Sequence, residues 1–353
     1  MQDITPHNIQ TLVSLIEKAE KIAIVGHMKP DGDALGSCVG MYHFLIACGK
    51  TDIRIVLPNR APSYLDFLLD KDTSGILCVH EDKPKKAEVA IQESDLIFCL
   101  DFNAFHRTDS LETSLSDSTG TKVLIDHHLN PDRDRFALSF SETEVSSASE
   151  FLYQILMKTP LINGNARKLP KKAALALMTG MTTDTNNFAN SVYPSTLRMA
   201  SDLIEVGVDR NMILSNLYNQ YSESRMRLMG HVLKDLMTIT ADGVAYIVLD
   251  SKVLKEYHIE EGDTEGFVNL PLSMAKVKMS LLLKEDGDKI RVSIRSKKGI
   301  SANRCSQLHF NGGGHENAAG GRLYMPKDVA DIKAAAAYIE EHTHIFMTQE
   351  NEK

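Results

Sequence analysis

Short apolar runs alternate with segments of helical spacing through the first half of the chain, and this alternation constrains the fold more than any other feature. An apolar run as short as residues 22–25 is typical of a buried strand rather than a helix. Strands that alternate with helices predict a mostly parallel sheet covered on both faces. The expected strands are residues 22–25, 53–57, 95–100 and 122–125, and the expected helices are residues 34–48, 147–158 and 171–182.

The pattern changes in the last third of the chain, where apolar runs follow one another more closely. Residues 285–288, Glu-Asp-Gly-Asp, form a strong turn signal between two of these runs. We therefore predict an α/β protein: a doubly wound, mostly parallel sheet domain plus a smaller mixed-sheet α/β domain. The expected elements of the second domain are strands at 244–249, 278–283 and 290–294 and a helix at about 328–341.

The length of 353 residues also fits two domains, at roughly 100–200 residues each. Polar helical segments at 197–207, 210–218 and 222–237 separate the two patterns and are expected to connect the domains. The expected boundaries are a first domain at 1–195, a helical connector at 196–235, a second domain at 236–345 and a disordered tail at 346–353.

Composition narrows the class of protein and of partner. The five cysteines form no CxxC pair, and an odd, scattered set suits a reducing compartment, so we expect a cytoplasmic protein. The sequence contains no run of about 20 apolar residues, so no membrane span is expected. The first residues lack the pattern of a signal peptide. The formal net charge is -8, whereas proteins that hold long duplexes carry broad basic surfaces. A short anionic ligand held by a local basic cluster is therefore favoured.

Metal-binding side chains gather where three of the predicted strands end. The segment that follows the strand at 22–25 holds one histidine and two aspartates within seven residues. An aspartate follows the strand at 95–100, Asp-His-His follows the strand at 122–125, and another aspartate lies at the end of the helix at 171–182. Carboxyl ends of parallel strands meet at one sheet edge, where ligands bind. The side chains expected there are His27, Asp31, Asp33, Asp101, Asp126, His127, His128 and Asp184.

Each of these motifs also has a purely structural interpretation. Asp33 alone would be an ordinary helix N-cap, many strands end in aspartate, and Asp184 alone marks a helix end that runs into a turn. Several carboxylates packed together without a cation would, however, repel one another and have raised pKa values. Mixed imidazole and carboxylate ligands suit manganese better than magnesium. We therefore predict two divalent metal ions, manganese preferred, of the kind that lie about 3.5–4 Å apart and activate water for attack on phosphorus.

A second cluster lies in the predicted second domain and is suited to phosphate. Gly312, Gly313 and Gly314 precede His315, and successive glycines let backbone N–H groups approach an anion. Residues 291, 293 and 295 share one strand face by the two-residue period, and the arginines among them can bind phosphate through bidentate hydrogen bonds. The alternatives are a glycine-rich turn and a solvated basic strand. The basic-strand residues are Arg291, Ser293 and Arg295.

The ordered motifs resemble those of the DHH phosphoesterase superfamily. The motifs are His27-x-x-x-Asp31-x-Asp33, then Asp101, Asp126-His127-His128 and Asp184, and the segment 312–320 resembles the signature of the DHH-associated C-terminal domain. The resemblance covers about residues 15–345. Within the superfamily the chain is most similar to stand-alone bacterial enzymes of the nanoRNase and 3′-phosphoadenosine 5′-phosphate phosphatase type, often labelled exopolyphosphatase-related. After Asp184 the family usually has Thr-Gly, whereas this chain has Thr185-Asn186-Asn187.

The resemblance implies that the first domain is catalytic, that the second binds substrate and that the active site lies in the cleft between them. It also implies a role for each motif residue. His27 and Asp31 would hold one metal, Asp33, His127 and Asp184 the other, and Asp101 would bridge them. His128 would contact the scissile phosphate or orient the site, with Asp126 behind it. The residues that would hold the rest of the substrate are Arg291, Arg295, Ser296, Gly312, Gly313, Gly314, His315, Asn269 and Phe267, the last as a surface for base stacking.

The resemblance implies hydrolysis of short 5′-phosphorylated oligoribonucleotides and of 3′-phosphoadenosine 5′-phosphate by a two-metal mechanism. A cyclic-dinucleotide or pApA phosphodiesterase is the alternative, and an exopolyphosphatase, a RecJ-type exonuclease and a non-catalytic nucleotide sensor are less favoured. The expected partner is a short oligoribonucleotide or a small phosphorylated nucleotide, with no long duplex and no membrane. A homodimer is left open.

Overall fold

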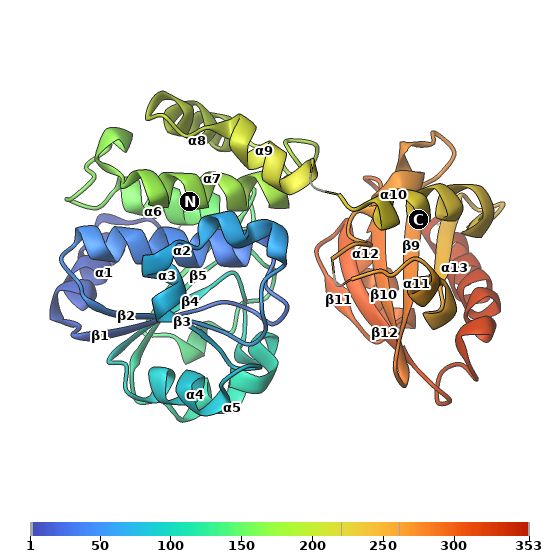
Figure 1. Ribbon diagram of the computed structural model, residues 1–353, viewed down its shortest axis with the longest axis horizontal. Coiled ribbons are helices and arrows are strands. Elements are labelled where there is room, and N and C mark those ends of the chain that lie inside the picture. Colours follow the sequence, from blue (N-terminus) through green and yellow to red (C-terminus); the bar gives the residue numbers. More distant parts are fainter. Residues whose placement is uncertain (1–2, 220, 261, 352–353) are drawn as a thin grey trace. The chain divides into compact units, whose positions relative to one another are not determined.

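The computed structural model describes residues 3–219, 221–260 and 262–351, which form two compact units, Met1–Gln220 and Tyr221–Lys353. This division confirms two domains of the predicted α/β classes. Each domain is described below by itself (Figure 1).

The first domain is built on a six-stranded sheet in the order β3-β2-β1-β4-β5-β6, in which every neighbouring pair is parallel. The strand order therefore reverses between β1 and β4, and the chain leaves these two adjacent strands in opposite directions. The expected mostly parallel sheet is wholly parallel, and its two edge strands, β3 and β6, were not predicted. The strands are β1 Lys21–Val25, β2 Asp52–Leu57, β3 Leu77–Val79, β4 Leu96–Leu100, β5 Thr121–Asp126 and β6 Leu138–Ser141.

Helices cover both faces of this sheet, as Figure 1 shows. One core packs α1, α2, α6 and α7 against side chains such as Ile24 and Phe98, and the other packs α4 and α5 against the alternate side chains, such as Ala23 and Ile97. These alternations follow from the two-residue period of a strand buried on both sides. The helices are α1 Pro6–Lys18, α2 Gly32–Ala47, α3 Lys71–Ile76, α4 Pro84–Gln92, α5 Glu112–Asp117, α6 Ala148–Met157, α7 Lys171–Asp184, α8 Pro194–Glu205 and α9 Arg210–Tyr218.

Helices α2 and α7 approach each other closely because glycines of α2 lie at the contact. A Cβ atom on Gly36 would lie 2.6 Å from the carbonyl oxygen of Ala176, and one on Gly32 would lie 2.4 Å from the Thr183 side chain. No side chain is tolerated at such distances without a backbone shift. This packing places the start of α2 beside the end of α7, and these are the two helix ends that carry Asp33 and Asp184.

The second domain contains a mixed sheet in the order β11-β12-β10-β9-β8-β7, parallel only between β8 and β9. The predicted turn at 285–288 joins β9 and β10, with Gly287 at φ 66°. Strands β7, β11 and β12 were not predicted. The elements are α10 Glu223–His231, β7 Met237–Ile239, β8 Val244–Leu249, α11 Ser251–Glu256, β9 Met279–Asp286, β10 Lys289–Ser296, α12 Ala302–His309, β11 Gly313–Gly314, β12 Ala318–Tyr324 and α13 Ala335–Asn351.

Two expected boundaries differ from the structure. The expected connector at 196–235 is divided: α8 and α9 pack on the core of the first domain, and α10 begins the second. The prediction of a disordered tail from residue 346 is wrong for 346–351, because α13 continues to Asn351 and buries Phe346 and Met347. Residues 352–353 lie outside the described part. Within the described residues, no helix is long and apolar enough to cross a membrane.

Candidate metal centre

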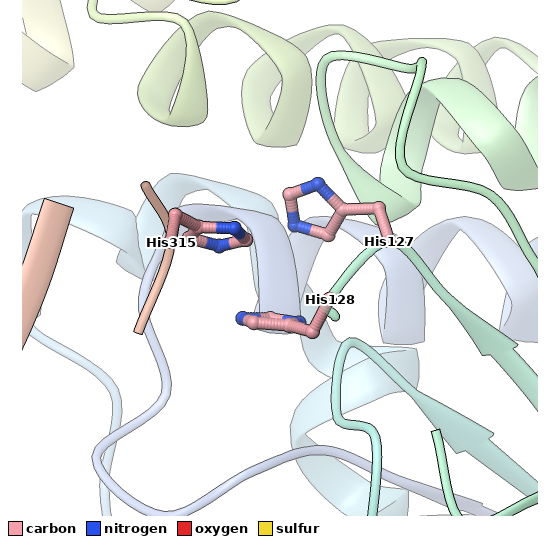
Figure 2. Close-up of side chains that lie close together, drawn as sticks. All are labelled: His127, His128 and His315. Atoms are coloured by element: carbon pink, nitrogen blue, oxygen red, sulfur yellow. The ribbon is translucent and has the colours of Figure 1, made fainter. Parts of the chain in front are cut away.

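The predicted metal ligands meet where the strand order of the first sheet reverses. His27 follows β1 by two residues, Asp101 follows β4 directly, and β4 lies between β1 and β5. Loops that leave adjacent strands in opposite directions open a crevice at the carboxyl edge, the usual ligand site of such sheets. Figure 2 shows the rings of His127 and His128 beyond the end of β5.

Asp101 occupies the middle of this cluster. Its two carboxylate oxygens face different histidines: Oδ2 lies 3.3 Å from Nε2 of His27, and Oδ1 lies 3.4 Å from Nε2 of His127. The residue is 2% exposed, and among the described residues Oδ1 accepts no hydrogen bond. Its φ of 64° is in the left-handed region, which aspartate adopts more readily than most residues. A buried carboxylate oxygen without a donor is suited to a cation.

His27 is oriented by its own loop. Its Nδ1 lies 2.8 Å from the carbonyl oxygen of Met28, and because a carbonyl oxygen only accepts, Nδ1 carries the hydrogen. In the neutral ring Nε2 therefore presents a lone pair toward Asp101 and Asp31, as metal-binding imidazoles do. Asp31 Oδ1, 3.8 Å from that Nε2, also accepts from the backbone N–H groups of Asp33 and Ala34. Asp31, and not Asp33, is thus the N-cap of α2.

Asp33 is held by the N-terminus of α6. Its Oδ2 accepts from the N–H of Ala148 at 2.7 Å and its Oδ1 from the N–H of Ser149 at 2.9 Å. Unpaired N–H groups and the helix dipole make a helix N-terminus favourable for a carboxylate. Asp33 is 1% exposed, and Oδ2 lies 3.9 Å from Nε2 of His127. Two N–H donors fix the direction of this carboxylate.

Asp184 is the last residue of α7, and its Oδ2 lies 3.6 Å from Nε2 of His127. The departure from the family pattern lies directly after it, where Asn186, Asn187 and Phe188 have φ values of 46°, 57° and 67°. Asparagine tolerates this region, whereas a bulky residue there is strained. Arg210 holds the loop, since its Nη2 donates to Asn187 Oδ1 at 2.6 Å and its guanidinium lies 5.7 Å from the Phe188 ring centre.

His128 makes a different contact from His127. Its Nδ1 lies 2.7 Å from Oδ1 of Asp126, and its backbone N–H donates to the other oxygen of the same carboxylate at 3.1 Å. Asp126 is fully buried at the end of β5. The two donors use both oxygens of Asp126, so this carboxylate orients His128.

The pKa shifts of the clustered carboxylates and imidazoles indicate that the site favours cations. Burial alone would raise the pKa of Asp101, but the imidazoles of His127 and His27 lower it well below the usual range. Burial opposes a charged His127, yet Asp101 and Asp184 raise its pKa to about 10. Burial and neighbouring carboxylates raise the pKa of Asp184 to about 6. Without a metal, the cluster therefore holds protons that compensate its negative charge, and a divalent cation replaces them.

Asp101 belongs to three groups of potential ligands, one of which is the Asp126–His128 pair described above, and it links the other two. One comprises His27, Asp31 and Asp101, the other Asp33, Asp101 and His127, and within each the ligand atoms lie within 4.8 Å of one another. Asp184 joins the second group through His127. Imidazole and carboxylate donors of this kind fit divalent transition metals.

Comparison with known proteins agrees with this geometry. The model of the DHH family, N-terminal domain, matches residues 21–181, and that of the DHHA1 domain matches residues 242–341. A Thermus thermophilus protein named bifunctional oligoribonuclease and PAP phosphatase NrnA is 30% identical over 88% of this chain and 87% of its own length. The chain belongs to the DHH family. As a member, this DHH protein is a phosphoesterase hydrolase that depends on divalent metal.

Further relatives span both DHH-family domains. A Streptococcus mutans protein named probable bifunctional oligoribonuclease and PAP phosphatase NrnA is 28% identical over 92% of this chain and 96% of its own length. The crystal structure of an exopolyphosphatase-related protein from Bacteroides fragilis superposes with a TM-score of 0.89 at 35% identity and covers 98% of both chains. RecJ from Thermus thermophilus, with a TM-score of 0.53 at 14% identity, shares the fold.

In the DHHA1 domain, the predicted basic strand face lines a pocket. Arg291, Ser293 and Arg295 alternate with buried residues along β10 and border a cavity of about 150 Å³. Lys284, directly opposite Arg291 in the β9–β10 register, also lines it. Lys284 was not singled out from the sequence, although its distance from the turn at 285–288 places it opposite Arg291. The lining contains three cations and one carboxylate, that of Glu265.

Phe267 and Ser296 do not take the positions predicted for them. Phe267 is 1% exposed and belongs to a core with Leu228 and Ile247, so it offers no surface for base stacking. Ser296 is 8% exposed, and its hydroxyl donates to the carbonyl oxygen of Ile300 at 2.6 Å, which closes the turn after β10. Asn269 lies half-buried in the 3-10 helix Phe267–Ser273.

The glycine segment is explained by strand packing rather than by an anion nest. A Cβ atom on Gly312 would lie 1.9 Å from the carbonyl oxygen of Gly320, and one on Gly314 would lie 2.5 Å from that of Ala318. The N–H groups of Gly312, Gly314 and His315 donate to Ser306 O, Asn303 Oδ1 and Ala318 O. Gly313 pairs with Gly320 in the β11–β12 ladder.

Proposed function

We propose that this DHH protein is a manganese-dependent hydrolase of short 5′-phosphorylated oligoribonucleotides and of 3′-phosphoadenosine 5′-phosphate. The observation that carries the proposal is the position of Asp101, whose two oxygens face two separate groups of metal-binding side chains. The names of the Thermus thermophilus and Streptococcus mutans relatives support the substrate class.

Each side chain of the cluster has a separate task in this proposal. His27 and Asp31 would hold one ion, Asp33, His127 and Asp184 would hold the other, and Asp101 would serve both. The chemistry that such a pair supplies is water activation at neutral pH and neutralisation of charge at phosphorus. His128, whose Nδ1 is held by Asp126, would contact the scissile phosphate through its other ring nitrogen. The imidazole ligands favour manganese over magnesium.

The pocket of the DHHA1 domain supports an anionic, multi-phosphate substrate. Arg291, Arg295 and Lys284 line it beside the hydroxyl of Ser293, and guanidinium groups suit bidentate binding of phosphate. We assign this pocket to the part of the nucleotide that is not cleaved.

The deciding experiment is an assay of the purified protein after chelation, with manganese or magnesium added back at equal concentration. The substrates are a 5′-phosphorylated RNA dimer and pentamer, 3′-phosphoadenosine 5′-phosphate, pApA, cyclic di-AMP and polyphosphate. We expect manganese to restore turnover of the RNA dimer and of 3′-phosphoadenosine 5′-phosphate more effectively than magnesium, and Asp101→Asn to be inactive. Turnover of cyclic di-AMP or polyphosphate with neither favoured substrate cleaved would contradict the proposal, as would full activity in protein shown to be metal-free.

A further inference from the structure

A buried arginine underlies one wall of the DHHA1 pocket and was not singled out from the sequence. Arg225 lies on α10 and is 7% exposed. Its guanidinium donates to three backbone carbonyl oxygens of another segment: Nη1 to Gly262 O at 3.4 Å and to Asp263 O, and Nη2 to Glu265 O at 2.6 Å. One side chain thus holds the whole loop from 262 to 265.

Aromatic rings enclose the same guanidinium. The ring centre of Tyr221 lies 4.1 Å from the Arg225 Cζ atom, and that of Phe267 lies 5.0 Å from it. A buried charge is costly unless it is hydrogen-bonded, and the carbonyl oxygens and ring faces supply that compensation. Phe267 therefore packs against an arginine of its own domain, which explains why it is buried and not available to a base.

The loop that Arg225 holds turns at two glycines. Gly262 and Gly266 have φ values of 97° and 79°, in the region that favours glycine. Gly262, Thr264, Glu265 and Gly266 line the pocket whose other wall carries Arg291 and Arg295. The carbonyl groups of the loop thus bind Arg225 while the same residues border the pocket.

We propose that Arg225 is a positioning residue for nucleotide binding: it fixes the 262–266 loop so that Glu265 and Gly266 stay opposite the cationic strand. This inference rests on the proposed function of the pocket. Arg225 itself touches no substrate. Replacing Arg225 should weaken binding of the nucleotide and should not change the metal-binding side chains of the first domain.

The test compares Arg225→Met, which keeps length and apolar contact with both rings but has no N–H donors, with a matched control. Arg227→Met alters the same helix at an exposed arginine whose guanidinium pairs with Glu223 at 2.6 Å. For Arg225→Met we expect KM for 3′-phosphoadenosine 5′-phosphate to rise about 10-fold or more. A rise of this size corresponds to the free energy of roughly one charge-assisted hydrogen bond. We expect kcat, manganese affinity and the turnover of bis-nitrophenyl phosphate to change far less.

Further variants separate the possible outcomes. Arg225→Lys restores the charge but reaches fewer carbonyl oxygens and should give an intermediate KM. If Arg225→Met fails to fold, Arg225→Lys is the decisive variant, together with faster amide hydrogen exchange at 262–266.

An unchanged KM, or equal losses on both substrates, would overturn the positioning role. If Arg291→Ala alone raises KM, the proposed function stands and the role of Arg225 falls. If the wild type cleaves no nucleotide, the proposed function falls, and calorimetric binding of 3′-phosphoadenosine 5′-phosphate to both variants decides the role of Arg225.

Discussion

His128 Nδ1 donates to Oδ1 of the fully buried Asp126 at 2.7 Å, so a ring at the metal cluster is turned by a carboxylate that reaches no solvent. The contact settles which ring nitrogen carries the hydrogen whenever the imidazole is neutral. Asp126 also accepts from the backbone N–H of His128 at 3.1 Å. The direction of the ring and the end of β5 are therefore linked through one side chain.

Replacing Asp126 by Asn should impair catalysis without removing the metals. An amide has one oxygen acceptor for two donors, so either the ring or the backbone N–H of His128 loses its partner. We expect kcat to fall about 10- to 100-fold, the usual effect of removing a residue that orients a metal-site histidine. Manganese titration and steady-state kinetics check this, and an unchanged kcat would contradict the orienting role.

Asp101→Asn should abolish turnover while the fold persists. The carboxylate faces His27 and His127 on separate oxygens, and an amide cannot neutralise two cations. The loss should correspond to several kcal/mol of transition-state stabilisation. Circular dichroism should match the wild type. A variant that kept a tenth of wild-type turnover would show that Asp101 does not bridge.

Gly180→Ala should weaken binding of the ion assigned to Asp33. A Cβ atom on Gly180 would lie 2.0 Å from Ser149 Oγ and 2.8 Å from Asp33 Oδ1, so Asp33 must shift from the N–H groups that orient it. We expect manganese affinity to fall about 10-fold or more. Gly230→Ala is the control, because no atom lies within 4 Å of its Cβ position on α10. Wild-type affinity in Gly180→Ala would show that this contact does not position Asp33.

Stability of the DHHA1 domain should decline as the pH falls from 7.5 to 5. His309 Nδ1 lies 3.1 Å from Nδ1 of His342, and burial together with that imidazole lowers the pKa of His309. The unfolded chain, with a histidine pKa of about 6.5, then binds more protons than the folded one, so acid favours unfolding. Hydrogen exchange of α12 and α13 at the two pH values measures this. His309→Gln should flatten the difference, and an equally steep response in that variant would assign it to other groups.

Some elements could be predicted from the sequence and others could not. Strands β1, β4 and β5 are apolar on both faces and could be predicted, whereas β3 has three residues and β6 four, too few for a periodic signal. Strand β12 contains Ala-Ala-Gly-Gly, which has low strand propensity, and it forms because it pairs along its whole length with β10. The end of α13 has the composition of a tail, yet Phe346 and Met347 find a core to pack against.

The sequence by itself determined the alternation of the central strands and helices of the first domain, and with it the edge of the sheet at which the carboxylates and histidines gather, because parallel strands carry their ends to the same side. Only the tertiary structure decided which donors each side chain meets. Asp33 faces the N–H groups of α6, more than a hundred residues away along the chain, and Phe267 packs on Arg225 rather than facing solvent. Local periodicity reports which face of an element is apolar, whereas the partner across a contact depends on how distant elements pack.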